Sequence, residues 1–302
     1  MARFAIEPGA PGRRVDQAVA EASPGLSVAA ARRLIAAGGV RIDGRLARKG
    51  DRVMGGQTVE IDDQRQVEQT TAGQRVTPDA SAPLDVLAVD DDWVAIAKPA
   101  GIPSHPLRAG EIGTAANALV ARFPECADAA PDPREGGLVH RLDTGTSGVL
   151  IAARGAPAWA ALRRALAEPD CEKVYLAEVR GAAGAGTSHE AIGRAGRRSA
   201  RVRIGGGRNP LPATTRWEPR ELRPETTLLA VHLSKGRAHQ VRAHLAAAGH
   251  PLVGDPLYGG GAATDAGGLL HLHAWSVRFR DPRSNRPISI EAPPPAWAKM
   301  RT

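Results

Sequence analysis

The segment GGLVHRLDTGTSGVLIAAR, residues 136–154, carries the features on which the fold and the chemistry of this chain depend. It sets one carboxylate, Asp143, among Thr, Gly and Ser residues that are typical of a turn, and the apolar run that follows predicts a buried strand. The simplest interpretation is a turn aspartate that hydrogen-bonds its own backbone. Two catalytic interpretations compete with it, and the rest of the chain has to decide among the three.

The tripeptide Asp143-Thr144-Gly145 suggests the first catalytic interpretation, an aspartic protease. Such enzymes work with two aspartates that share one proton, so a single copy requires a homodimer. Their fold is all-β, whereas the Asp143 strand leads into a helix that its Ala-rich sequence predicts over residues 156–169. Arg141 would also disturb the shared proton, because a nearby cation favours the ionised carboxylates. These features disfavour a protease.

The composition favours a nucleic-acid partner without requiring one. The chain has 302 residues, with 40 Lys and Arg against 32 Asp and Glu, which gives a formal net charge of +8. Most of these cations are arginine, whose planar fork suits phosphate better than lysine does. A GC-rich genome explains the same excess of Arg and Ala without any functional reason, so charge alone decides nothing.

The sequence gives no sign of a membrane or of an oxidising compartment. Its apolar runs are too short to cross a bilayer, and residues 1–14 lack the apolar centre of a signal peptide. The two cysteines, Cys126 and Cys171, stand in unrelated contexts that suggest neither a disulfide nor a metal site. We therefore expect a cytoplasmic protein without membrane contact.

The first sixty or so residues predict a small, separate α/β unit. Helices are expected over 15–22 and 27–39, a hairpin over 40–47 and a closing strand over 57–61. Basic residues gather on the second helix and the hairpin at a density that favours a nucleic-acid surface over a merely solvated face. These residues are Arg32, Arg33, Arg41, Arg45, Arg48, Lys49 and Arg52.

A composition change separates this unit from a second domain. Residues 64–84 lose apolar periodicity and gain Gln, Thr, Pro and Ser, which predicts a linker between residues 1–63 and a domain over 85–302. In that domain, strand and helix patterns mix without regular β-α-β repetition. The fold class we predict is therefore α+β, with a mixed, largely antiparallel sheet. The sequence contains neither a Walker loop nor a dinucleotide fingerprint, so no nucleotide cofactor is expected.

Two further patterns in the second domain are candidates for binding. The arginine-rich stretch 192–210 alternates Arg with Val and Ile at positions 201–204, which predicts a strand with one basic face. His271 and His273 share a strand face, but no third ligand has the spacing of a zinc site. We expect packing histidines and no metal.

The string HRLDTGTSG, residues 140–148, resembles the catalytic motif of the RluA family of RNA pseudouridine synthases. Further stretches resemble the motifs of that family in the same order, from about Val86 onward, and several ordered motifs are far more specific than one. They are VAIAKPAGIPSHP (94–106), KVYLAEV (173–179), PATTRWE (212–218), GRAHQVRAHLAAAGHPLVGDPLYG (236–259) and LHLHAWSVRFRDP (270–282).

The N-terminal unit fits the same family. Residues 13–45 resemble the αL-type RNA-binding domain that many members carry, a fold shared with a small-subunit ribosomal protein. The chain departs from the usual motifs at Thr144-Gly145, where many members have Lys-Asp, and at Ala238, where many have Thr. Neither departure touches the residues that the family uses for chemistry.

The resemblance implies a catalytic domain with a central RNA-binding cleft and assigns three residues to the chemistry. Asp143 starts the cleavage between ribose and uracil, Arg242 is the ion-pair partner that keeps it ionised, and Tyr175 stacks on the target base. Arg141 fills the space that the extruded base leaves. The other residues expected to bind RNA or substrate are His140, Leu142, Thr146, Ser147, Lys173, His239 and Gln240, with Arg32, Arg33 and Arg41 in the N-terminal unit.

Without the resemblance, these assignments would have plainer alternatives. Arg242 would be an ordinary exposed helix arginine, and Tyr175 a strand tyrosine with a wet hydroxyl group. Thr146 and Ser147 are expected to shape the turn and reach phosphate, because the sequence offers no evident base partner for serine chemistry.

Conversion of uridine to pseudouridine involves no redox change, so we expect no cofactor. A carboxylate that acts at the sugar, as nucleophile or as base, can start the cleavage, and the covalent intermediate stays open. We predict an RNA pseudouridine synthase that acts as a monomer on RNA, ribosomal RNA foremost. A non-catalytic RNA-binding or ribosome-assembly factor on the same scaffold is the alternative, which the set of Asp143, Tyr175 and Arg242 disfavours.

Overall fold

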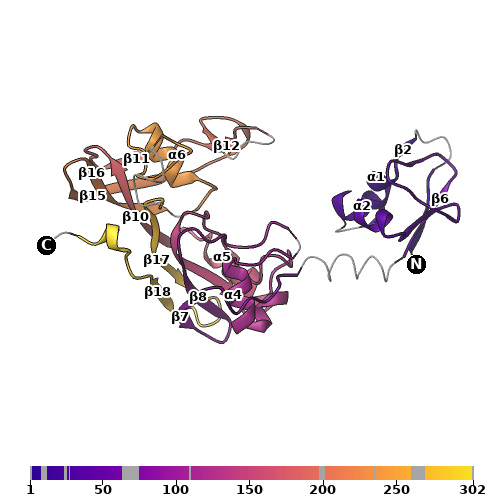
Figure 1. Cartoon of the computed structure of the whole chain (residues 1–302), viewed down its shortest axis with the longest axis horizontal. Coiled ribbons are helices and arrows are strands. Elements are labelled where there is room, and N and C mark those ends of the chain that lie inside the picture. The colour runs from indigo at the N-terminus through magenta and orange to yellow at the C-terminus, as the bar shows by residue number, and fades with distance from the viewer. Residues whose placement is uncertain are drawn as a thin grey trace. The chain divides into compact units, whose positions relative to one another are not determined.

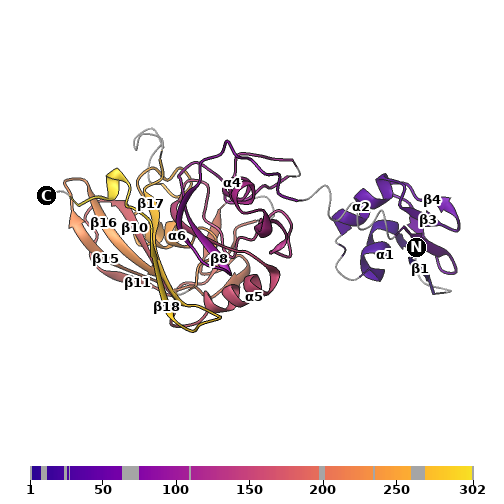
Figure 2. The same ribbon diagram turned by 90° about the horizontal axis from the view of Figure 1, so that it is seen from below.

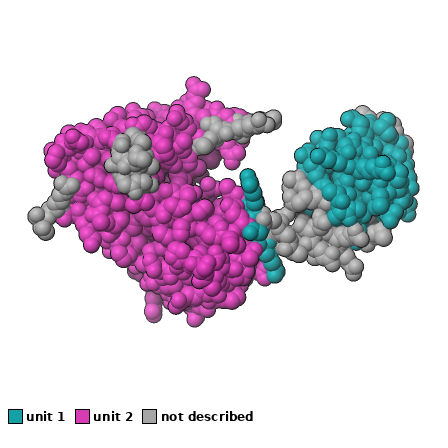
Figure 3. All heavy atoms as spheres, viewed as in Figure 1, with its two compact units in different colours: residues 1–75, 108–110 teal, residues 76–107, 111–302 magenta. Residues whose placement is uncertain are grey.

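The computed structural model describes residues 2–7, 12–23, 26, 28–62, 75–108, 110–196, 201–233, 235–259 and 269–300. They form two compact units, one of residues 1–75 with 108–110 and the other of residues 76–107 with 111–302 (Figure 3). Most of the predicted linker, together with Arg197 and Arg198 of the arginine-rich stretch, lies outside the described residues. Of the helices in the described part of the chain, none is long and apolar enough to cross a membrane.

The first unit joins two helices and a small antiparallel sheet in one hydrophobic core. Apolar side chains of both helices, such as Val19 and Leu34, are buried with Val40 and Val59 of the sheet. The sheet has the strand order β1-β6-β3-β4, and β2 pairs with β5 beside it. The elements are β1 (Ala2–Ala5), β2 (Arg13–Arg14), α1 (Val15–Ala22), α2 (Val28–Ala36), β3 (Val40–Ile42), β4 (Arg45–Leu46), β5 (Arg52–Val53) and β6 (Thr58–Ile61).

The hairpin of this unit has the turn that its sequence predicts. Asp43 and Gly44 have φ of +48° and +78°, the left-handed conformation that a two-residue hairpin turn requires at both central positions. The Asp43 carboxylate also accepts the backbone N–H of Thr58 at 2.8 Å. The turn is thereby tied to the neighbouring strand β6.

The second unit is built on a nine-stranded sheet with the order β11-β15-β16-β10-β17-β9-β8-β7, and β18 pairs with β17 (Figure 1). Among the described strands of this sheet, β9 and β17 form the one parallel pair, so the sheet is largely antiparallel as predicted. Its strands are β7 (Asp85–Val89), β8 (Trp93–Lys98), β9 (Ser147–Ala153), β10 (Glu172–Arg180), β11 (Gly186–Ser188), β15 (Thr215–Leu222), β16 (Thr226–Leu233), β17 (Leu272–Arg280) and β18 (Pro287–Glu291).

Strand β9, which follows Asp143, is buried on both faces. Val149 and Ile151 share a core with Leu162 of α5, while Leu150 lies in the core on the other face with Leu119 of α4. This explains the unbroken apolar run after the turn, because a strand covered on both faces has no polar side. The helices and 3-10 turns of the unit are α4 (Ala115–Arg122), η1 (Pro124–Asp128), α5 (Ala156–Ala165), α6 (Gln240–Ala247) and η3 (Ala296–Ala298).

The parallel contact between β9 and β17 depends on a glycine. Gly148 pairs with Ala274 and has φ of +115°. A Cβ atom at Gly148 would lie 2.1 Å from the backbone oxygen of Ala274, so a larger residue could not be accommodated without moving one strand. The turn that carries Asp143 can therefore enter the sheet directly beside β17.

A second, three-stranded sheet lies next to α6. It consists of β12 (Ile192–Arg194), β13 (Val202–Ile204) and β14 (Arg208–Leu211), with β12 in the centre. Helix α6 packs against β13 and β15, and Figure 1 shows it between β12 and β11, while Figure 2 shows α4 and α5 on opposite sides of β8. Arg203 of β13 is exposed between two half-buried residues, as the predicted basic strand requires.

The second unit begins earlier than the composition suggests. Val76 is buried among the side chains around α4, and its N–H donates to the carbonyl of Pro133 at 3.0 Å. Asp79 N–H donates to the carbonyl of Asn117 at 3.0 Å. Residues 76–84, assigned to the linker from the sequence, thus pack on this unit. The apolar residues of this stretch, Val76 and Leu84 among them, follow no periodic pattern from which their burial could be predicted.

Candidate active site

The turn that carries Asp143 is held on both sides by residues 98–104. The Ser104 hydroxyl accepts the N–H of Leu142 at 3.0 Å and donates to its carbonyl at 2.7 Å. On the other side of Asp143, the carbonyl of Thr144 accepts the N–H of Gly101 at 2.8 Å and the Nζ of Lys98 at 3.2 Å. The backbone on either side of the carboxylate is therefore fixed before any substrate binds.

Lys98 is a buried lysine whose ammonium donates to three backbone carbonyls, a role that the sequence did not reveal. Its Nζ also donates to the carbonyls of Pro99 and Ile102, at 3.0 and 2.6 Å. Burial lowers the pKa of Lys98 to about 8, and the charge of Asp143 opposes that shift. The lysine is a structural clamp that also places a cation near the carboxylate.

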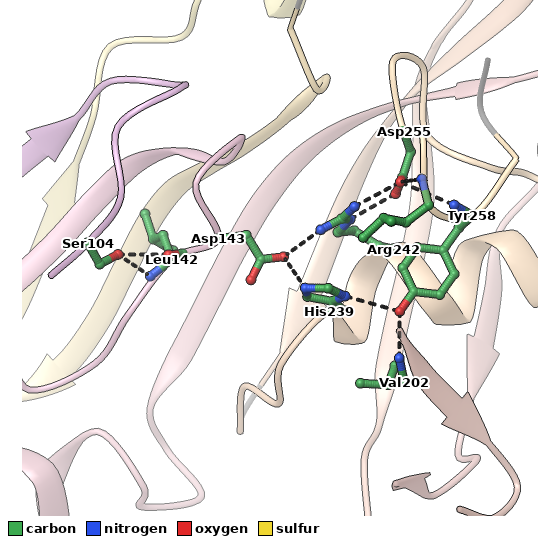
Figure 4. Close-up of polar contacts among 9 residues, drawn as sticks. Ser104, Leu142, Asp143, Val202, His239, Arg242, Asp255 and Tyr258 are labelled. Carbon is green, nitrogen blue, oxygen red and sulfur yellow. Dashed lines mark hydrogen bonds and ion pairs between the residues drawn. The ribbon is translucent and has the colours of Figure 1, made fainter. Parts of the chain in front are cut away.

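The two oxygens of Asp143 have different surroundings. Oδ2 accepts a hydrogen bond from Nη1 of Arg242 at 3.1 Å, and Nε2 of His239 lies 3.7 Å from the same oxygen. Oδ1 accepts no hydrogen bond from any residue that the structure describes (Figure 4). The carboxylate is thus paired through one oxygen and open through the other.

Arg242 is locked in place by a second carboxylate. Its Nε and Nη2 donate to the two oxygens of Asp255, each at 2.8 Å, in a bidentate pair. Asp255 is fully buried, and its Oδ1 also accepts the backbone N–H groups of Leu257 and Tyr258. Burial alone would raise the pKa of Asp255, but Arg242 and these donors hold it below the ordinary value. Arg242 is therefore not the exposed helix arginine of the plainer interpretation.

A cleft of about 500 Å³ opens beside Asp143. Its wall is strongly basic, and Asp143 is the one carboxylate among the described residues that line it. A cleft of this charge attracts an anionic polymer and leaves a single negative group at its centre. The lining cations are Arg141, Arg163, Lys173, Arg194, Lys235, Arg237 and Arg242.

Most of the predicted catalytic-domain residues come together in this cleft. Tyr175 lies on β10, and burial, with a contribution from Asp143, raises the pKa of its phenol. Arg141 is exposed at the wall and forms no ion pair within the described part of the chain. The predicted residues that line the cleft are His140, Arg141, Leu142, Asp143, Thr146, Lys173, Tyr175, His239, Gln240 and Arg242.

The polar groups of several lining residues form hydrogen bonds with other parts of the protein. Nε2 of His140 accepts the N–H of Ile151 at 3.1 Å, and burial lowers the pKa of His140 to about 3, with Lys173 and Arg163 adding to the shift. The Gln240 side chain donates to Thr214 and Thr215. Leu142 is buried in the core around α4, and Lys173 donates to the carbonyl of Leu166 at 2.7 Å. Their binding roles stay predictions.

Ser147 differs from the sequence-based expectation. Its Oγ lies 2.8 Å from Nδ1 of His273, so the serine does have an imidazole partner, 126 residues away in the chain. Ser147 does not line the cleft, and His273 is buried with its Nε2 3.4 Å from the carbonyl of Ala292. The pair joins β9 to β17 rather than serving the site.

His271, the other histidine of that strand face, also has a protein partner. Its Nδ1 lies 2.7 Å from Oε2 of Glu178, and its ring stacks on Trp297. Within the described ranges, no group of three or more His, Cys, Asp or Glu side chains is arranged to hold a metal ion.

In the N-terminal unit, one candidate arginine, Arg32, pairs with a buried carboxylate, Asp16, together with Arg14. Asp16 accepts Nε and Nη2 of Arg14, each at 3.0 Å, and Nε of Arg32 at 2.6 Å. Hydrogen bonds from Arg14 and Arg32 lower the pKa of Asp16 to about 2, the bond from Arg14 being the largest cause. Arg41 is exposed and donates to the carbonyl of Gly44, whereas the side chain of Arg33 lies outside the described residues.

The geometry disfavours the protease interpretation. An aspartic protease would need Asp143 from two copies of the chain to share one proton. Here Asp143 is paired with the guanidinium of Arg242, and such a cation favours the ionised form over a shared proton.

Comparison with protein families gives two matches. Residues 92–247 match the family described as RNA pseudouridylate synthase, and residues 13–59 match the S4 domain. The first match contains Asp143, Tyr175 and Arg242, and the second lies within the N-terminal unit.

Curated relatives match over nearly the whole chain. A protein of Xanthomonas campestris pv. campestris, named ribosomal large subunit pseudouridine synthase D, is 37% identical over 97% of this chain and 89% of its own length. The protein of the same name from Escherichia coli O157:H7 is 33% identical over 94% of this chain and 88% of its own length.

Solved structures agree with the fold of the second unit. Human RNA pseudouridylate synthase domain containing 1 superposes with a TM-score of 0.57 at 27% identity, covering 72% of this chain and 86% of the human one. Human RNA pseudouridylate synthase domain containing 4 gives a TM-score of 0.54 at 20% identity, covering 71% of this chain and 90% of the human one.

Proposed function

The chain belongs to the RNA pseudouridylate synthase family, and from that premise we propose that it isomerises uridine in ribosomal RNA with Asp143 as the group that starts the reaction. One observation carries the assignment to Asp143. Its Oδ2 is paired with Arg242 while its Oδ1 accepts no hydrogen bond from the described residues that surround the cleft. A carboxylate that is paired with a cation through one oxygen and open through the other is suited to act on a ribose.

The reaction moves one bond and two protons. The bond between N1 of uracil and C1′ of ribose breaks, the base turns, and C5 bonds to C1′ in its place. N1 ends with a proton and C5 loses one, so no electron donor or acceptor takes part. Oδ1 of Asp143 acts either on C1′ as a nucleophile or on the proton of C2′ as a base, and both routes need an ionised carboxylate.

Tyr175 serves the base rather than the sugar. Its buried phenol keeps its proton at neutral pH, because burial and the nearby Asp143 raise its pKa. The ring offers a stacking surface for uracil, and the neutral hydroxyl can pass the proton of C5 toward an acceptor such as the released Asp143 carboxylate. The exposed Arg141 at the cleft wall is available to take the place of the extruded nucleotide.

The N-terminal unit, which contains the match to the S4 domain and is called the S4 unit from here on, supplies a second contact to RNA. Arg14 and Arg32 expose 41% and 53% of their side chains although Asp16 orients both, so their outer N–H groups can bind phosphate. A monomeric state and a cytoplasmic location remain predictions. The ribosomal substrate in the relatives' names supports the second of these.

The test is replacement of Asp143 by Asn, which keeps the size of the side chain and removes its charge. Tritium release from RNA labelled at C5 of uridine should fall by at least about a thousandfold, while RNA binding persists. Asp170→Asn is the matched control, because Asp170 is exposed and pairs with Arg280 outside the cleft. Appreciable release by the Asp143 variant would contradict the assignment. Identical pseudouridine maps in cells with and without the gene would favour the RNA-binding factor.

A further inference from the structure

His239, beside Asp143, has a backbone conformation that demands an explanation. It stands at the N-terminal end of α6 with φ of +55°, a left-handed conformation that is uncommon outside glycine, although His, Asn and Asp adopt it more often than other residues. Strain of this kind persists only when the surroundings hold the residue in place, and it gathers at functional sites. His239 lines the cleft, so its strain is located where the reaction takes place.

Tyr258 is the residue that holds the His239 ring. The Tyr258 hydroxyl lies 3.1 Å from Nδ1 of His239, and the two rings meet edge to face with centroids 5.8 Å apart. The same hydroxyl oxygen accepts the backbone N–H of Val202, in β13, at 2.9 Å. The imidazole is therefore fixed between the phenol on one side and Asp143 on the other (Figure 4).

The charge of Asp143 selects one proton arrangement in this chain of contacts. If Nδ1 carried the proton of a neutral imidazole, the lone pair of Nε2 would face Oδ2 of Asp143. If Tyr258 donates its proton to Nδ1, then Nε2 carries the imidazole proton and directs it at the carboxylate. The second arrangement is attractive and the first repulsive, so His239 presents an N–H group to Asp143.

We propose that Tyr258 and His239 form a positioning arm for Asp143, an inference that rests on the proposed function. Through the arm, Nε2–H of His239 acts on Oδ2 as a second donor beside Arg242, which fixes the rotation of the carboxylate and keeps Oδ1 directed at the ribose. The 3.7 Å between Nε2 and Oδ2 is longer than a hydrogen bond. Such distances commonly tighten when substrate is bound.

Asp255 fixes the two donors of Asp143 relative to each other. It binds the guanidinium of Arg242 through both oxygens and the backbone N–H of Tyr258 at 3.2 Å through Oδ1. Arg242 lies over the Tyr258 ring, 5.4 Å from its centroid. Asp255 therefore anchors both Arg242 and Tyr258. Arg242 and His239, in turn, both face Oδ2 of Asp143.

Tyr258→Phe tests the arm with the removal of a single atom. The ring remains, and with it the contacts to His239 and Arg242, so the variant should fold. With full-length protein and a tritiated ribosomal RNA fragment, we expect the single-turnover rate at saturating RNA to fall about tenfold. The RNA Kd should stay within about a factor of two, because the arm acts on Asp143 and not on RNA.

His239→Asn is the second variant, since Asn tolerates a left-handed backbone better than most residues and lacks the reach of Nε2. Its rate should fall at least as much as that of Tyr258→Phe, and the double variant should be no slower than His239→Asn alone, because either change removes the same arm.

Three outcomes would overturn the arm. An unchanged rate with weaker RNA binding in Tyr258→Phe would mean that the phenol only supports β13. Unchanged rates in both variants would mean that the contacts among Tyr258, His239 and Asp143 do not affect the reaction. Multiplied losses in the double variant would mean that the residues act separately. Asp143→Asn in the same assay separates these failures from that of the proposed function, because only its activity bears on the nucleophile or base.

Discussion

The two units each contain a triad of aspartate and arginine, and the triads are built in opposite order. In the S4 unit, one buried carboxylate, Asp16, lies between two guanidiniums that expose 41% and 53% of their side chains. In the second unit, one guanidinium with 8% exposure, Arg242, lies between the carboxylates of Asp143 and Asp255. The first triad has a net charge of +1 at the surface, and the second has −1 at the wall of a cleft.

In the function that we propose, the same two types of side chain serve RNA binding in one unit and chemistry in the other. Exposed guanidiniums oriented by a buried partner keep free N–H groups for phosphate, and salt screens them. The buried guanidinium of Arg242 instead directs three of its five N–H groups at two carboxylates, and it places a cation 3.1 Å from Oδ2 of Asp143. Burial and the order of charges decide the role, and the residue types alone do not.

Removing the centre of the catalytic triad should have the largest effect. Arg242→Met leaves Asp143 and the fully buried Asp255 without their shared cation. Orphaned buried charges typically cost about 3–5 kcal/mol, so urea unfolding should show a loss of that size, and turnover should fall sharply. An undiminished free energy of unfolding would mean that the buried triad is not formed in solution.

A double-mutant cycle then tells which carboxylate depends more on Arg242. Asp255 makes two hydrogen bonds with Arg242 and Asp143 makes one. Combined with Arg242→Met, Asp255→Asn should therefore show a larger departure from additivity in the free energy of unfolding than Asp143→Asn does. The reverse ranking would contradict the anchoring role of Asp255.

Deleting the N-terminal unit, and with it the triad of Asp16, Arg14 and Arg32, should have a smaller effect. That effect should fall on RNA affinity rather than on turnover. A chain without residues 1–75 should fold, because Val76 and the residues after it pack on the second unit. Its RNA Kd should rise and its salt dependence should flatten, by roughly 2 in slope if Arg14, Arg32 and Arg41 each contact one phosphate of a single strand. Unchanged affinity and slope would show that the S4 unit takes no part in binding this RNA.

A deletion of residues 1–84 is the control for that boundary. It also removes the N–H of Val76 that Pro133 accepts and the N–H of Asp79 that Asn117 accepts. We expect this shorter chain to be less stable than the 1–75 deletion in urea, and equal stabilities would place the boundary nearer to Asp85.

The smallest effect is expected from Asp16→Asn, which frees the two exposed arginines from their partner. The cost should be on the order of 1 kcal/mol for the N-terminal unit, since both guanidiniums stay solvated. The folded pKa of Asp16, about 2, lies below its ordinary value of 3.8. Its contribution to stability is therefore present above pH 3.8 and is lost as the pH falls toward 2. The variant should lack that acid-dependent loss in urea titrations of the full chain. The same pH dependence of stability in the variant and in the unchanged chain would mean that Asp16 does not pair with these arginines in solution.

The family resemblance predicts one connection in these triads, the pair of Asp143 and Arg242, which the structure forms across 99 residues. No spacing rule would give that pair without the resemblance. Neither the residue pattern nor the resemblance points to Asp16, Arg14 or Asp255, or to Tyr258 in the stretch 236–259. The available signals were a second tyrosine in a chain with only two and an aspartate in a tight Gly-Pro loop.

Other misses have the same physical origin. The partner of Ser147 became visible only when β9 and β17 were placed side by side, because a parallel pair joins segments that are distant in sequence. His140 lines the cleft, and its predicted contact with substrate stays a prediction; the bond that its Nε2 accepts from the N–H of Ile151 could not be read from the motif. Local pattern shows which residue types are present, whereas long-range pairing determines what they do.

The glycine contact between Gly148 and Ala274 also has a consequence for the order in which a ribosome completes this protein. Strand β9 gains its neighbour β17 only after a further 126 residues have been added. At about 5–20 residues per second this takes roughly 6 to 25 s, during which the Asp143 turn has neither its sheet neighbour nor, for most of that time, Arg242. The S4 unit has a complete core of its own from the first sixty or so residues. A nascent chain therefore acquires the arginines that we propose to bind phosphate well before the site that we propose for the reaction.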